Sequence, residues 1–256
     1  MSCETEFAWT SFACSHTGMV RPINEDACLE RPELGLWVVA DGMGGHALGE
    51  LASSMVVQAL GALPHQENLE DFIVQVRARL QDVNRQLRAE AAMRDVPIIG
   101  STVVALLASQ RRCACLWAGD SRIYLYRGSE LRQLTRDHSQ IEELRQTGTI
   151  SDEDALRHPA RNLITRAIGA ADLLDLDEGT LDGRDGDMFL LCSDGLSNEV
   201  SEQDMCDALV SGNCRQAAET LLALALDHGG NDNVSVIVAR ADDLYSTEKT
   251  VLNPAL

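Results

Sequence analysis

Aromatic side chains are scarce in this sequence: phenylalanine, tryptophan and tyrosine make up 4% of its 256 residues, although 45% of the chain is hydrophobic. Its core must therefore be built mainly from leucine, valine, isoleucine, alanine and methionine. A chain of this length can bury one large core or two modest ones. Because we find no long linker, repeat array or low-complexity segment, we expect a single domain over residues 1–244 and a loose tail over residues 245–256.

Cysteine pairs with the spacing of metal-binding or redox motifs are also missing. None of the eight cysteines belongs to a Cys-x-x-Cys pair, and only Cys113 and Cys115 are close in sequence. The first residues contain no basic segment followed by an apolar one, so no secretory signal is indicated. No run of about 18 apolar residues could span a membrane. These features predict a cytoplasmic protein that has no disulfide framework and does not act at a membrane.

Basic residues are few compared with acidic ones. The chain has 21 lysines and arginines against 40 aspartates and glutamates, which gives a formal net charge of -19. Such a chain repels nucleic acid and anionic lipid, so nucleic-acid binding is not expected. An acidic excess commonly serves solubility alone. It is also what a protein with carboxylates gathered around cations would show.

Apolar segments of two lengths predict the secondary structure. Short ones bounded by glycine, aspartate or asparagine predict strands over residues 9–15, 36–40, 101–108, 113–118, 123–127, 188–192 and 234–240. Spacing and capping signals predict helices over residues 50–63, 69–93, 201–212 and 216–228, and a short helix that begins at Ser151. Strands and helices do not alternate regularly, which favours two packed sheets with helix pairs outside over a parallel Rossmann-type sheet. We expect Asp120-Ser121 to join two of the strands as a tight hairpin.

Four aspartates stand where an apolar strand stops or starts. Asp41 and Asp194 each end an apolar run and precede a glycine, Asp120 follows another run, and Asp232 precedes a strand. Asp-Gly is also a common turn pair, so each aspartate alone has a purely structural explanation. If these strand ends meet at one rim, the carboxylates converge and repel one another unless they are protonated or neutralised by a cation. Since no Cys–His spacing is present, oxygen ligation of Mg²⁺ or Mn²⁺ is favoured over structural zinc.

The glycine-rich loop after Asp41 also matches a nucleotide-binding pattern. Residues 42–47 fit Gly-x-Gly-x-x-Ala between a predicted strand and a predicted helix. The second strand with an acidic end, expected about 20 residues later in a dinucleotide-binding fold, is missing. The chain enters the long helix over residues 69–93 instead, so dinucleotide binding is disfavoured.

A second polar cluster lies near the N-terminus. Arg21 stands four residues before the acidic pair Glu25-Asp26. One interpretation is a polar loop with a local ion pair, which contributes little to stability. The other is a phosphate-binding arginine beside metal-binding acids, because the guanidinium fork matches phosphate oxygens.

Eight segments, taken together and in this order, resemble one family. They are MVRPINEDA (19–27), VVADGMGGHALGE (38–50), GSTVVALL (100–107), AGDSRIYLYR (118–127), LTRDHS (134–139), NLITRAIG (162–169), LLCSDGLSNEV (190–200) and GGNDNVSVIV (229–238). The family is that of the PP2C-type metal-dependent protein serine/threonine phosphatases, in their compact bacterial form. The resemblance implies an α+β fold with four αββα layers, in which helix pairs flank a central antiparallel β-sandwich.

The resemblance also implies a two-metal centre that hydrolyses phosphoserine and phosphothreonine with metal-activated water. By this likeness, Asp41 bridges two Mn²⁺ or Mg²⁺ ions, and the Gly42 carbonyl assists at one of them. Asp194 and Asp232 hold the other ion. Glu25 contributes at the second ion, either directly or through water.

Further roles follow from the same resemblance. Asp26 supports the neighbouring glutamate, and Asp120 with Asp194 looks like the weaker third-metal site of bacterial members. Arg21 grips the phosphate. His46 is the candidate general acid for the leaving alkoxide, although a histidine at this place could simply cap the following helix.

The expected partners are phosphorylated proteins, including a serine/threonine kinase that the phosphatase would oppose, and we expect a monomer. The segment over residues 138–164 would be the flap near the substrate. His16 departs from the family, since many relatives carry an acidic residue there, which leaves the surroundings of the ligands uncertain but not the main ligands themselves. A catalytically silent regulator that binds metal or phosphoprotein is the alternative function.

Overall fold

The computed structural model describes residues 7–45, 47–151, 154, 158, 160 and 163–243. The expected tail over residues 245–256 lies outside the described residues, and so does the candidate general acid His46. Most of the short helix expected from Ser151 lies outside them as well.

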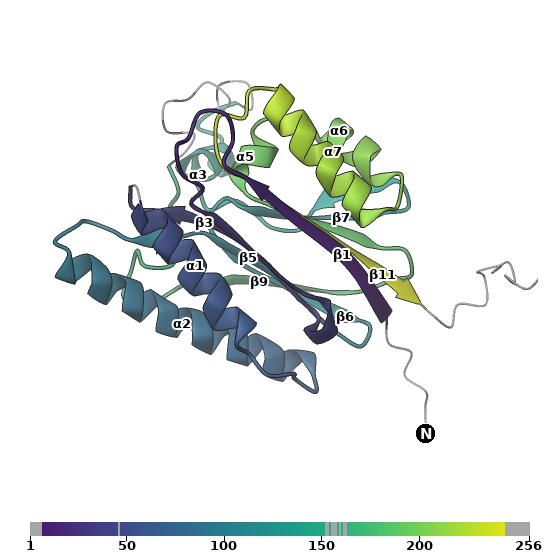
Figure 1. The fold of residues 1–256 in the computed structure, drawn as a ribbon, viewed down its shortest axis with the longest axis horizontal. Helices are drawn as coiled ribbons and strands as arrows, with labels where there is room; N and C mark the ends of the chain where they lie inside the picture. Colours follow the sequence, from purple (N-terminus) through teal and green to yellow (C-terminus); the bar gives the residue numbers. More distant parts are fainter. Residues whose placement is uncertain are drawn as a thin grey trace, which may run out of the picture.

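Two antiparallel sheets form the centre of the fold (Figure 1). Sheet A has the strand order β1–β11–β10–β7–β8, and its strands are β1 Phe7–His16, β11 Val234–Asp243, β10 Met188–Cys192, β7 Arg122–Arg127 and β8 Glu130–Gln133. Sheet B has the order β2–β3–β5–β6–β9, and its strands are β2 Asp26–Arg31, β3 Leu36–Met43, β5 Val103–Ser109, β6 Arg112–Ala118 and β9 Asp177–Asp182. The two-residue strand β4 Gly100–Ser101 pairs with β3.

Helix pairs cover the two outer faces (Figure 1). On sheet B these are α1 Ala47–Gly61 and α2 Leu69–Met93, and on sheet A they are α6 Glu202–Leu209 and α7 Cys214–Asp227. The shorter helices are η1 Pro32–Leu34, α3 Gln140–Gln146 and α5 Asp194–Ser197. The expected four-layer arrangement with a central antiparallel sandwich is therefore confirmed.

The apolar runs of the central strands reflect burial on both faces of each sheet. In β3, Leu36 and Val38 pack toward α1 and α2, whereas Trp37 and Val39 enter the core between the sheets. Phe189 of β10 meets that inner core from sheet A. Successive strand residues point to opposite faces, so a strand covered on both sides reads as a continuous apolar run.

The prediction that Asp120-Ser121 forms a tight hairpin is wrong. Strand β6, which ends before it, belongs to sheet B, and β7, which follows it, belongs to sheet A. The chain crosses between the sheets here, with Gly119 at a φ of 109°. Two apolar runs joined by a short polar link look the same in sequence whether the strands pair side by side or stack face to face.

The strands that sequence patterns did not predict lie mainly at sheet edges. β2, β8 and β9 are each the last strand of a sheet. Their sequences DACLER, ELRQ and DEGTLD are rich in charge. Edge strands commonly carry charged residues that discourage pairing with other chains, so they lack the apolar signal of central strands.

Candidate metal centre

The aspartates singled out in the sequence come together at one end of the sandwich. Asp41 lies in β3 directly opposite Asp26 of β2. Asp194 is the first residue of α5, which follows β10, and Asp232 lies just before β11. Asp120 lies in the crossing between β6 and β7. Acidic groups from both sheets therefore share one rim, as the strand-end pattern suggested.

Polar side chains fasten the two sheets together beneath this rim. The Ser193 hydroxyl donates to Asp26 Oδ2 over 2.8 Å, which joins sheet A to sheet B. In sheet B, the Asp41 amide donates to Thr102 Oγ1 at 3.0 Å. The Thr102 and Ser121 hydroxyls lie 2.7 Å apart. The carboxylate of Asp26 and the backbone of Asp41 are thus held by short hydrogen bonds.

Burial and mutual repulsion disturb the acid groups of this rim. Burial raises the pKa of Asp26 and of Asp120 to about 7 and that of Asp194 to about 6. The pKa of Asp41 is raised well above its ordinary value, first by burial and then by the charges of Asp26 and Asp194. Each shift means that the ionised form lacks compensating positive charge. We call Asp26, Asp41, Asp120, Asp194 and Asp232 the acid cluster.

The groups present fit a hard divalent cation. Asp26 Oδ1 is buried and has no hydrogen-bond partner. The surrounding donors are carboxylate and carbonyl oxygens, which Mg²⁺ and Mn²⁺ prefer. Within the described ranges, no three His, Cys, Asp or Glu side chains already stand in ligating positions. Mg²⁺ usually takes only one or two carboxylates and keeps several waters, so such a cage is not required.

Gly42 stands where no side chain would fit. A Cβ atom at this residue would lie 2.0 Å from the carbonyl oxygen of Gly49 and 2.7 Å from that of Glu25. The Gly42 amide also donates to the Glu25 carbonyl at 3.0 Å. The backbones of β3, α1 and the Glu25 loop therefore approach closely, and this approach brings Glu25 and the Gly42 carbonyl to the edge of the acid cluster.

Arg21 finds a partner far away in the sequence. Its Nη2 atom lies 2.7 Å from Asp232 Oδ2, and the two side chains are 50% and 32% exposed. The local ion pair with Glu25-Asp26 that the sequence left open is therefore not its main contact. The guanidinium pairs with an aspartate of the acid cluster and is half exposed, so an anion arriving from solvent can reach it.

The expected flap is anchored to the same rim. His138 accepts a hydrogen bond from the Gly119 amide at its Nδ1 atom, over 3.2 Å, and its own amide donates to the Gly119 carbonyl. The Thr165 amide donates to the His138 carbonyl at 2.8 Å. Both ends of the segment thus meet beside Asp120, while part of its middle lies outside the described residues.

Asn233 is a structural residue of the site that sequence reasoning missed. It is 5% exposed, and its side-chain amide donates to the carbonyls of Thr17 and Ile23, at 2.8 and 2.9 Å. Its Oδ1 atom accepts from the Glu25 amide at 2.8 Å. One side chain thus ties the loop that carries Arg21 and Glu25 to the start of β11. The only sequence signal was its position directly after Asp232.

Replacing Asn233 with alanine is expected to lower the free energy of unfolding by about 3 kcal/mol, because three hydrogen bonds of about 1 kcal/mol each are lost. Urea unfolding measures the difference. The matched control is Asn231→Ala in the same loop. Its side chain is exposed and donates to Glu199 after α5, and its replacement should change stability by less than about 1 kcal/mol. Equal losses in the two variants would contradict the role of Asn233 as the tie between these loops.

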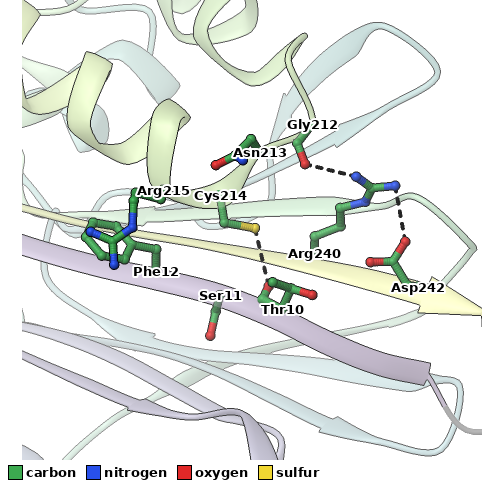
Figure 2. A pocket seen from close by; sticks show the side chains of 9 residues that line it. All are labelled: Thr10, Ser11, Phe12, Gly212, Asn213, Cys214, Arg215, Arg240 and Asp242. Atoms are coloured by element: carbon green, nitrogen blue, oxygen red, sulfur yellow. Dashed lines mark hydrogen bonds and ion pairs between the residues drawn. The ribbon is translucent and has the colours of Figure 1, made fainter.

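A separate hollow of about 380 Å³ lies between β1, β11 and the start of α7 (Figure 2). Arg240, which lines it, is eight residues beyond Asp232 along an extended strand, or about 25 Å away. Its guanidinium donates to the Gly212 carbonyl and pairs with Asp242, and the Cys214 thiol donates to the Thr10 carbonyl. Because of this distance, the hollow is not part of the candidate site.

Comparisons with known proteins point to one family. A sequence model of protein phosphatase 2C matches residues 16–227. The serine/threonine protein phosphatase PstP of Mycobacterium tuberculosis is 40% identical over 249 residues, which cover 95% of this chain and 47% of PstP. This chain therefore spans about half the length of that relative. The serine/threonine phosphatase stp of Listeria monocytogenes is 37% identical over 238 residues, which cover 88% of this chain and 93% of stp.

Solved structures agree with the sequence comparisons. PppA of Pseudomonas aeruginosa superposes with a TM-score of 0.88 at 42% identity, covering 93% of this chain and 99% of PppA. The catalytic domain of PstP in complex with two manganese ions superposes with a TM-score of 0.85 at 36% identity, covering 93% of this chain and 100% of that domain. Over the described part of this chain, no helix is both long and apolar enough to cross a membrane.

Proposed function

We propose that this chain, which belongs to the protein phosphatase 2C family, hydrolyses phosphoserine and phosphothreonine in proteins at a centre of two Mn²⁺ or Mg²⁺ ions. The observation that supports this most directly is the acid cluster itself. Several partly buried aspartates from both sheets share one rim, and burial raises their pKa values in the absence of positive charge. Such a cluster is costly to the fold unless cations occupy it.

The residues that would hold the ions are those that the sequence indicated. Asp41 would bind both ions, one of them together with the Gly42 carbonyl and Glu25, and the other together with Asp194 and Asp232. When bound, the two cations supply an activated water and neutralise charge on the phosphoryl oxygens. Hydrogen bonds under the rim hold the carboxylate of Asp26 and the backbone of Asp41 in place before any ion arrives.

The chain's other groups bind and orient the substrate. Arg21 has five N–H donors and uses one in its pair with Asp232, so others remain for phosphoryl oxygens. His46 donates the proton that the leaving alkoxide needs. Asp120, together with Asp194, would hold a third cation, and Asp26 would support the neighbouring Glu25. With cations present, a phosphate dianion approaches this site in spite of the formal net charge of -19.

The substrates we propose are phosphorylated proteins, a serine/threonine kinase among them. We further propose that the chain acts in the cytoplasm, as a monomer, and without nucleic acid or membrane as a partner. The strong acidic excess supports the last part, since it disfavours contact with polyanions. A comparison of phosphoproteins in cells that express the chain or its Asp194→Asn variant tests this target class.

Phosphate release from a chromogenic phosphomonoester is expected to require Mn²⁺ and to stop when EDTA removes the metal. Restoring excess Mn²⁺ should restore the rate, because the rim is held by hydrogen bonds that do not depend on the ion. Circular dichroism in EDTA serves as the control that the fold persists. Hydrolysis at the full rate in EDTA would contradict the proposal. Tight Mn²⁺ binding by calorimetry, without hydrolysis of any phosphopeptide, would support the silent regulator instead.

A further inference from the structure

Two large apolar side chains stand exposed beside the acid cluster. Met19 and Val20, in the loop between β1 and β2, are 69% and 64% exposed. In the described part of the chain no other two exposed large hydrophobic residues are neighbours in sequence. Single exposed apolar side chains are ordinary, whereas adjoining ones next to a polar site indicate a binding surface. We call Met19 and Val20 the apolar pair.

The loop holds the apolar pair in a defined place. The Met19 amide donates to the Gly230 carbonyl at 2.7 Å. Gly18 has a φ of +82°, and a Cβ atom there would lie 2.1 Å from the Asp232 carbonyl oxygen. The Asn233 side-chain amide also donates to the carbonyl of Thr17, the residue before Gly18. The backbone that carries the apolar pair is therefore packed against the segment that carries Asp232.

The next residue in the chain links the apolar pair to the acid cluster. Arg21 directly follows Val20 and lies 2.7 Å from Asp232. A phosphoryl group bound by Arg21 would leave the neighbouring residues of an extended peptide within reach of the pair, because a strand advances about 3.3 Å per residue. A preformed apolar surface costs little conformational entropy when it binds.

We propose that Met19 and Val20 contact an apolar side chain that flanks the phosphoserine or phosphothreonine of the substrate. The inference rests on the proposed function and names the kind of substrate that the site prefers. The occupant is a peptide rather than a free phosphate ester, because a small ester bound at Arg21 has no atoms to place on the pair. An apolar flank fits better than an acidic one, since acidic residues would meet a chain with a formal net charge of -19.

Two phosphothreonine peptides test the proposal, one with leucine on both sides of the phosphothreonine and one with glutamine at the same places. For the wild-type chain, kcat/KM is expected to be about tenfold higher for the leucine peptide, as partial burial of one aliphatic side chain predicts. In the variant with both Met19→Ser and Val20→Ser the ratio should fall to about one. Because each ratio is taken within one variant, a general loss of activity does not imitate this result.

Val210→Ser is the matched control, since Val210 is 66% exposed at the end of α6, away from the acid cluster. It should keep the wild-type ratio. Val20→Ser alone serves where the double variant folds poorly, and should lower the ratio in the same direction. Fluorescence anisotropy of the same peptides, labelled and measured with every variant, gives the difference in affinity between them even where no turnover occurs.

The outcomes separate the two proposals. If the chain hydrolyses neither peptide but still binds the leucine peptide more tightly, the proposed function is contradicted and the apolar pair remains a peptide contact. Equal affinity and equal kcat/KM for the two peptides in the wild-type chain would overturn the inference. A wild-type ratio that survives in the double variant would overturn it as well. So would a double variant that changes only the oligomeric state, since the pair would then contact a second copy of this chain.

Discussion

Replacing Asp41 or Asp194 with asparagine is expected to lower kcat/KM for a phosphomonoester by about a thousandfold, or about 4 kcal/mol of transition-state stabilisation. Each change replaces a carboxylate that we propose as a metal ligand with a neutral amide, in a centre where the cations are expected to do most of the chemistry. The measurement is steady-state hydrolysis in saturating Mn²⁺. Thermal unfolding of each variant confirms that the rates refer to folded protein.

Asp187→Asn is the matched control for these variants. Asp187 is also an acidic residue next to a strand, but it immediately precedes β10, whereas Asp194 follows that strand. It is 1% exposed and pairs with Arg127 at 2.6 Å. Its replacement should destabilise the fold, because the arginine loses its buried partner, yet leave kcat/KM of the folded protein close to wild type. Wild-type turnover in both Asp41→Asn and Asp194→Asn would show that these residues are not the ligands.

In EDTA, the free energy of unfolding is expected to fall as the pH rises from about 4 to about 7. The pKa values of Asp26 and Asp120 in the folded state are about 7, and that of Asp194 is about 6, against an ordinary value of 3.8. Between these limits the folded chain holds protons that the unfolded chain has released. Stability therefore decreases with pH across this window.

Mn²⁺ should reverse this trend, because it binds the deprotonated carboxylates and so binds more tightly at higher pH. A concentration about 1,000 times the dissociation constant adds about 4 kcal/mol to the stability of the folded state. The increase in unfolding temperature on adding Mn²⁺ should thus be larger at pH 7.5 than at pH 5. These temperatures follow from thermal unfolding in buffers with EDTA or Mn²⁺.

Substitution of a single carboxylate separates this effect from other titrations. Asp194→Asn should flatten the pH dependence in EDTA and reduce the Mn²⁺ response at both pH values. The exposed acids Glu33 and Glu70, whose pKa values are lowered by their arginine partners, lose those pairs only below their ordinary pKa of 4.5, at the lower limit of the window. Stability that rises from pH 4 to pH 7 in EDTA would contradict the acid cluster as described.

Local patterns predicted much of the fold because local physics decides it. The long helix over residues 69–93 has the predicted bounds, since its apolar spacing and its N-cap at Asn68 act within a few turns. Central strands such as β10 were equally clear, because burial on both faces leaves an apolar run. The edge strand β9 was not predicted, because only its pairing with β6 distinguishes it from a polar loop.

Local patterns likewise identified some residues of the site and missed others. Asp41 and Asp194 could be singled out because each follows a strand-like run and precedes a glycine, and the ordered resemblance assigned them roles. The contact between Arg21 and Asp232 spans 211 residues and has no local signal. Asn233 was missed because its three hydrogen bonds go to backbone atoms, which any sequence supplies.

By itself, the sequence determined which residues carry charge at the ends of apolar strands, where the helices of the two outer layers run, and which family the ordered motifs resemble. The tertiary structure alone decided that β6 and β7 belong to different sheets, and that this crossing sets Asp120 at the same rim as Asp41. It also decided that the loop of Arg21 and the apolar pair rests on the segment of Asp232. The physical reason is that the periodicity of a sequence indicates which face of an element is apolar, whereas the element that covers this face is decided only by tertiary packing.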